Sequence, residues 1–93
     1  MAETIARVAT TQGSRYLQQL CKHWAHKLDV TFTPEEGTVR FVDAVAVMRA
    51  APEALVVTIT AEDPAVLDRM KGVVASHLDR FAFREAPLGF DWS

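Results

Sequence analysis

The stretch 13–28, GSRYLQQLCKHWAHKL, decides how the rest of the chain is arranged. At about 100° per residue around a helix, five apolar side chains fall on a single stripe. They are Leu17, Leu20, Cys21, Trp24 and Leu28. This spacing predicts an amphipathic helix that lies on a hydrophobic core.

The opposite face of this helix is polar and basic. It holds Arg15, Gln18, Gln19, Lys22, His23 and His26, with Lys27 near its edge. No acidic residue occurs between Thr4 and Leu28, although the whole chain has a formal net charge of −2. Two interpretations stay open: a solvated face that keeps the helix in solution, or a docking surface for an anionic partner or ligand.

Composition limits the classes of protein to which the chain can belong. Its 93 residues fit one domain, 1–93, and 49% hydrophobic with 24% charged residues is an ordinary globular composition. The acidic balance weighs against general nucleic-acid binding. Cys21 is the only cysteine, so no intrachain disulfide forms. Neither a signal peptide nor a membrane span is recognised, so we expect a cytoplasmic protein.

The remaining segments alternate between strand and turn patterns. We expect strands over 4–10, 30–32, 38–42, 45–50 and 55–60, with a turn at 33–37. Either Val45 and Val47 or Ala46 and Met48 face the core, because the alternation fits both registers. Asp63 and Pro64 predict the start of a second helix. Its apolar stripe holds Val66, Leu67, Met70, Val73, Val74, His77, Leu78 and Phe81.

The element order β-α-β-β-β-β-α predicts an α+β fold. We expect a two-layer α/β sandwich, with a mostly antiparallel sheet and both helices on one face. The tail 83–93 carries Phe90 and Trp92 and is too apolar to stay free in solution. It covers either its own sheet edge or a partner.

Two helix motifs carry a resemblance to a known family. The segments SRYLQQLCKHWAHK (14–27) and VVASHLDRFAFRE (73–85), with Phe90-Asp91-Trp92, resemble the bacterial domain of unknown function 2218 family. The resemblance implies a small bacterial protein without assigned activity. Some members are encoded beside, or fused to, siderophore-interacting flavin-dependent ferric reductases. The strand order also resembles a TATA-binding protein half-domain, a likeness of layout that does not extend to DNA binding.

Few residues here suggest site chemistry. Cys21 and His77 both lie on apolar stripes, and a Cys/His pair binds soft metals when it lies close enough. Each also fits an ordinary core position. His23 and His26 are three residues apart and suit a metal or a pH response, or simple solvation. No catalytic motif is recognised, so we expect neither an enzyme nor a cofactor.

Three hypotheses about function follow. The first is a binding or accessory module linked to siderophore iron acquisition, with a ferric reductase as its partner. Its contact residues are Arg15, Lys22, His23, His26, Lys27, Phe90 and Trp92. The second is a metal- or small-ligand-binding protein that uses Cys21 and His77. The third is a structural homodimer formed through the open sheet face.

Overall fold

The computed structural model describes residues 2–85, 88–90 and 92. The chain begins with strand β1 (Ala2–Ala9) and helix α1 (Gly13–Trp24), followed by a hairpin of β2 (Asp29–Phe32) and β3 (Glu36–Arg40). Strands β4 (Ala44–Ala51) and β5 (Ala54–Ala61) come next, and helix α2 (Pro64–Phe81) precedes the tail. The predicted order of elements is therefore confirmed.

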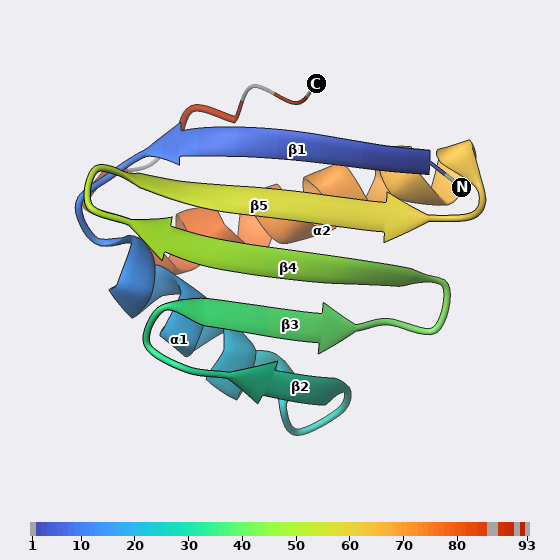
Figure 1. Cartoon of the computed structure of the whole chain (residues 1–93), viewed down its shortest axis with the longest axis horizontal. Helices are drawn as coiled ribbons and strands as arrows, with labels where there is room; N and C mark the ends of the chain where they lie inside the picture. The colour runs from blue at the N-terminus through green and yellow to red at the C-terminus, as the bar shows by residue number, and fades with distance from the viewer. Residues whose placement is uncertain (1, 86–87, 91, 93) are drawn as a thin grey trace.

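The strands form one antiparallel sheet in the order β1-β5-β4-β3-β2. Both helices lie on the same side of it, so Figure 1 looks directly onto the uncovered side. Helix α1 contacts mainly β4, β3 and β2, whereas α2 contacts mainly β5 and β1. The predicted α+β fold, with two helices on one face of the sheet, is confirmed.

Helix α1 is one turn shorter than its sequence pattern predicts. The stripe residues Leu17, Leu20 and Cys21 are fully buried, but the helix ends at Trp24 and Leu28 is only half-buried. The backbone amides of Lys27 and Leu28 both donate to the carbonyl of Trp24, at 3.0 and 2.9 Å. The chain has to turn here because β2 begins at Asp29.

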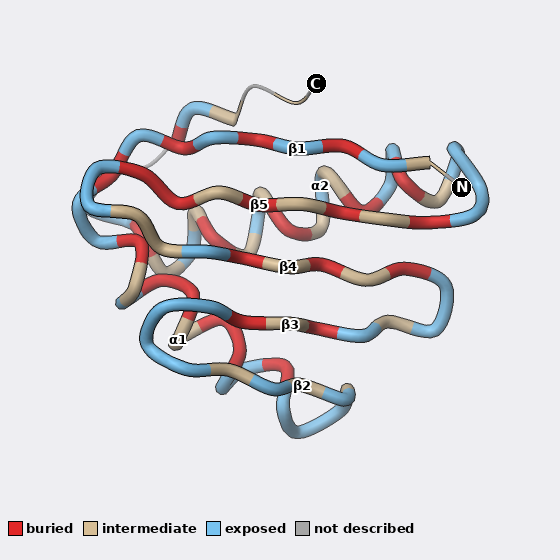
Figure 2. The backbone as a smooth tube through the Cα atoms, viewed as in Figure 1, coloured by how far each residue is buried: buried red, intermediate tan, exposed pale blue. Residues whose placement is uncertain are grey.

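Strand β4 settles the register that the sequence left open. Ala44, Ala46 and Met48 are buried, so Val45 and Val47 lie on the uncovered side of the sheet. Figure 2 shows this alternation of buried and intermediate residues along β4 and β5. Val39 of the hairpin is fully buried, while Val30, Phe32 and Phe41 pack against the core from its margin.

Helix α2 begins where the sequence predicts. The Asp63 carboxylate accepts a hydrogen bond of 2.9 Å from the Ala65 amide, and Pro64 occupies the first helical position. Leu67, Met70, Val74 and Leu78 are buried against the sheet. None of the helices in the described part of the chain is long and apolar enough to cross a membrane.

The described part of the tail returns to the sheet edge. Trp92 forms an antiparallel bridge with Ala6 of β1, and its ring stacks on Phe90 at 5.7 Å with a 10° angle between the planes. Leu88 is buried, and its amide donates to the Asp79 carboxylate at 2.9 Å. The tail therefore covers its own sheet edge, one of the two expected roles. Residues 86, 87, 91 and 93 of the predicted 83–93 tail lie outside the described residues.

Candidate binding surface on the helix layer

A polar cluster joins the start of α1 to the segment after α2. The Tyr16 hydroxyl and the Thr10 hydroxyl both donate to the carboxylate of Glu85. The Thr10 bonds measure 3.0 and 3.2 Å, and the same hydroxyl accepts from the Gln12 amide at 3.0 Å. The hydrogen bond to Glu85, followed by burial, raises the pKa of Tyr16 above its ordinary value. This cluster holds the C-terminal segment against α1.

Two arginines come together beside that cluster. A small cavity of about 60 Å³ is lined by Arg15, Tyr16, Phe81, Phe83 and Arg84. The Arg84 guanidinium lies 5.8 Å from the centre of the Phe83 ring, and Phe83 is 71% exposed. The fold therefore brings a cation from the start of α1 next to one from beyond the end of α2.

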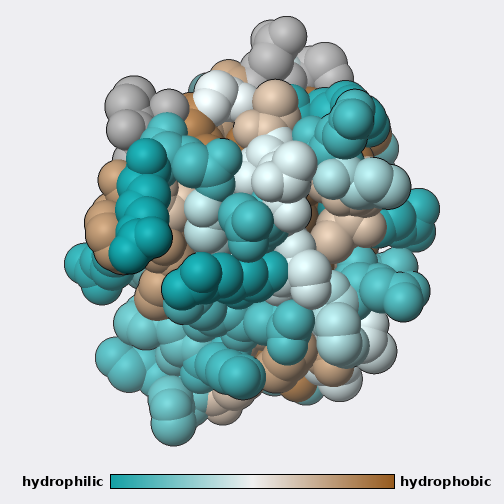
Figure 3. All heavy atoms as spheres, turned by 90° about the vertical axis from the view of Figure 1, so that its left-hand side faces the viewer, coloured by the Kyte–Doolittle hydropathy of each residue, from teal (hydrophilic) through white to brown (hydrophobic). Residues whose placement is uncertain are grey.

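The basic helix face is defined here as five exposed cations on the helix layer and its ends: Arg15, Lys22, Lys27, Arg80 and Arg84. The ion pairs found among described residues involve Arg49, Arg69 and Lys71. None of them includes a cation of the basic helix face. Figure 3 views the end of the molecule where α1 begins, and its surface is mainly hydrophilic with small separate hydrophobic areas.

His23 is exposed, and one side of its ring contacts helix α2. Its ring centre is 5.6 Å from that of His77 and 5.8 Å from that of Phe81. The exposure of His23 agrees with its predicted place on the polar face of α1, and its ring contacts with α2 are an additional finding. His26 is exposed beyond the end of α1, and no ring contact joins it to His23 among the described residues.

His77 has the partners expected of a core histidine. Its Nδ1 donates to the Val73 carbonyl at 2.7 Å, and its ring lies 4.9 Å from Trp24. A carbonyl only accepts, so this bond fixes the ring hydrogen on Nδ1. Trp24 in turn packs edge-on against Phe41 at 5.0 Å. These contacts form an aromatic group that joins α1, α2 and the hairpin.

No contact between Cys21 and His77 is found among the described residues. The Cys21 sulfur points at β3, where a Cβ placed on Gly37 would lie only 2.6 Å from it. Burial raises the pKa of the Cys21 thiol to about 11, which disfavours the thiolate that metals and electrophiles require. No group of three or more metal-binding side chains occurs among the described residues. Metal binding by this pair stays a prediction.

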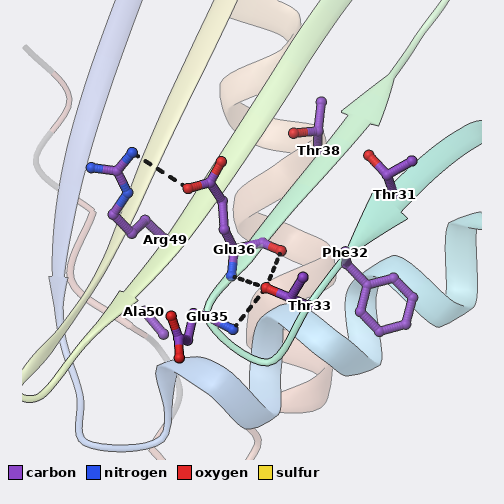
Figure 4. A pocket seen from close by; sticks show the side chains of 8 residues that line it. All are labelled: Thr31, Phe32, Thr33, Glu35, Glu36, Thr38, Arg49 and Ala50. Carbon is purple, nitrogen blue, oxygen red and sulfur yellow. Dashed lines mark hydrogen bonds and ion pairs between the residues drawn. The ribbon is translucent and has the colours of Figure 1, made fainter.

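An open hollow lies at the turn end of the β2–β3 hairpin. It has a volume of about 540 Å³ and is lined by Thr31, Phe32, Thr33, Glu35, Glu36, Thr38, Arg49 and Ala50. Figure 4 shows the Thr33 hydroxyl accepting from two backbone amides of the turn, and the Arg49–Glu36 ion pair of 3.4 Å beside it. The sequence predicted only a turn here.

Together these features define a class of protein: an antiparallel five-stranded sheet backed by two helices, with an aromatic tail on one edge. The chain belongs to the domain of unknown function 2218 family, described as an uncharacterised protein conserved in bacteria, whose model matches residues 5–93. The NMR structure of PA4090 from Pseudomonas aeruginosa is similar, with 35% identity and a TM-score of 0.85. That match covers 100% of this chain and 96% of the other. No curated protein matches the chain.

Proposed function

We propose that this domain is a non-catalytic docking module of the bacterial cytoplasm, and that its basic helix face binds an acidic surface of a protein partner. The convergence of Arg15 and Arg84 on one cavity supports this function, because neither cation has an ion-pair partner among the described residues. The five cations of the basic helix face outnumber the Glu85 carboxylate beside them, so on a chain of net charge −2 they create a local positive field that attracts anions.

The partner that the family resemblance favours is a siderophore-interacting ferric reductase. In that role the domain supplies contacts rather than chemistry. Its buried thiol has a pKa of about 11, and the Nδ1 of His77 is already engaged by a backbone carbonyl. Phe83, exposed beside Arg84, offers an apolar contact at the rim of the charged surface.

The test is direct binding to the purified ferric reductase from the same organism. Arg15→Glu combined with Lys22→Glu should weaken binding by about tenfold or more, mainly at low salt, since each exchange turns attraction into repulsion. Arg69→Glu combined with Lys71→Glu is the matched control, because it makes the same charge change on α2, at the exposed Arg69 and the half-buried Lys71. Equal weakening by both double variants contradicts a specific basic helix face, and failure of the wild-type domain to bind contradicts the choice of partner.

A further inference from the structure

The uncovered side of the sheet carries parallel rows of side chains, fixed by the strand register, and the three longest of them cross four or five strands. The middle row runs across all five strands as Ile5, Thr58, Val47, Thr38 and Thr31. Every residue in it is β-branched, and Ile5 at the edge is 40% exposed. Such a row presents a band of methyl groups, with three threonine hydroxyls among them, and β-branched side chains of this kind pack well against another sheet.

The two flanking rows carry charges of both signs. One flank holds Glu3, Thr60, Val45, Arg40 and Asp29, in strand order from β1 to β2. The other holds Arg7, Val56, Arg49 and Glu36, in the same order from β1 to β3. On β1 and again on β3, therefore, an acid in one flank stands opposite a base in the other, across the middle row.

We propose that two copies of this domain pack face to face through this side of the sheet, about a two-fold axis that runs across the strands along the middle row. Such an axis places β1 over β1 and exchanges the two flanks. Glu3 then faces Arg7 of the other copy, and Arg40 faces the other copy's Glu36. Each of these contacts occurs twice by symmetry, so the surface is complementary to itself.

The alternative two-fold axis, parallel to the strands, fails on charge. It places β1 of one copy over β2 of the other, and each flanking row then faces the same row of the other copy. Glu3 therefore meets Asp29 of the other copy. Arg49, on the central strand β4, meets its own symmetry mate. Like charges held face to face cost affinity, and this arrangement is therefore disfavoured.

Shape and area both allow the proposed pairing. A rotation preserves the hand of the sheet twist, so strands of the two copies stay aligned across the interface. Five strands at about 4.8 Å spacing, with about six residues each at about 3.3 Å, give a face of roughly 500 Å². Two copies bury about 1,000 Å² in total, which is the lower end for a specific interface and fits a dissociation constant in the micromolar range.

Exposed apolar groups and hollows on this side agree with the same arrangement. Val42, in the β3–β4 turn, is 102% exposed and lines one hollow together with Val45 and Thr60. The proposed rotation carries it towards the turn end of the other copy's hairpin, where the hollow of about 540 Å³ lies. A further hollow of about 170 Å³ lies over the centre of the sheet, between Val47 and Val56. Side chains of the second copy can fill both.

The experiment is sedimentation equilibrium of the full chain from about 5 to 500 μM, on a set of charge exchanges. The wild type should dimerise within this range. Glu3→Arg alone and Arg7→Glu alone should each raise the dissociation constant about tenfold or more, since each turns two symmetric attractions into repulsions. The double variant, Glu3→Arg with Arg7→Glu, should restore the wild-type value. Val47→Lys should abolish the dimer, because it sets two cations against each other on the axis.

Each other outcome overturns the proposal. A wild type that is monomeric throughout means that something else covers this face. A double variant as weak as the single ones, or a dimer strengthened by Glu3→Arg, means that the axis is wrong. A circular-dichroism melt of every variant separates loss of dimer from loss of fold. None of these substitutions touches the basic helix face, so the outcome is independent of reductase binding.

Discussion

Gly37 lies at a point of close approach between the helix layer and the sheet. A Cβ at this position would lie 2.6 Å from the Cys21 sulfur, 3.4 Å from the Phe32 Cβ and 3.5 Å from a Leu17 methyl. The backbone of Gly37 lies outside the left-handed region, so alanine is excluded by space and not by conformation. The substitution Gly37→Ala therefore tests the packing of α1 on the β2–β3 hairpin.

Two opposing effects determine how much Gly37→Ala lowers the free energy of unfolding. Overpacking of a well-filled core costs about 1–3 kcal/mol. Replacing glycine by alanine inside a strand returns about 0.5–1 kcal/mol through backbone entropy. The free energy of unfolding should therefore fall by about 1–2 kcal/mol, and the melting temperature by about 5–15 °C for a domain of this size.

Urea unfolding with a double-mutant cycle is the assay. Cys21→Ala alone should cost about 1–2 kcal/mol because it leaves a small cavity. The double variant, with both substitutions, should lose less than the sum by at least about 1 kcal/mol, since the new methyl group occupies the space of the sulfur. Gly72→Ala is the matched control, because nothing lies within 4 Å of a Cβ there, and it should raise stability by up to about 1 kcal/mol. Strict additivity of Gly37→Ala and Cys21→Ala would refute the contact between these two residues.

Three further outcomes are expected from single sites. Tyr16→Phe should lower the free energy of unfolding by about 1–2 kcal/mol at pH 8, through loss of the bond to Glu85. Folding raises the pKa of Tyr16, so this contribution to stability is present below pH 10 and is lost as the pH rises through the pKa of the folded state. Urea unfolding of the wild type and Tyr16→Phe up to pH 11.5 tests this. A difference in the free energy of unfolding that stays constant over this range contradicts it. The Cys21 thiol has a pKa of about 11, so it should react with a disulfide reagent at pH 8 about 100-fold more slowly in the folded protein than in urea. Equal reaction rates in the two states would show that the thiol is accessible in the folded protein. Trp92→Ala should increase amide hydrogen exchange along β1 and leave β3 unchanged, so uniform exchange along both strands argues against edge protection by the tail.

The element order was predictable because most segments carry one dominant pattern. Asp63 and Pro64 fix the start of α2, and strict alternation marks β5. Strand β4 was ambiguous because alanine and valine are both apolar, so neither face looks solvated. Its register follows from pairing with β5, which sets Met48 beside Val57 and Ala46 beside Ile59. Tertiary pairing therefore supplies what the local alternation in β4 lacks.

The candidate site was predicted only in part. The sequence shows which face of α1 is apolar, but not which side of that apolar face packs against α2. Cys21 and His23 lie about 160° apart around α1. The flank that holds Tyr16 and His23 meets α2 and the segment after it, whereas the flank that holds Cys21 meets β3. For Cys21 to contact His77, the side of α1 that holds Cys21 would have to face α2, and the side that holds His23 would have to face β3. Tyr16 and His23, seven residues apart and both aromatic, were the signal in the sequence for the flank that α2 covers.

The two faces of this domain differ in how their charges are distributed, and that difference separates their roles. The basic helix face has an excess of positive charge even with Glu85 beside it, so two copies repel each other there and an acidic partner is attracted. The uncovered sheet face alternates Glu3 with Arg7 and Arg40 with Glu36, so it carries little net charge and complements itself under one rotation. Because these faces lie on opposite sides of the sheet, a dimer built on the second presents two copies of the first outward. Two weak contacts to a dimeric or clustered partner would then act together, which raises affinity without any new contact.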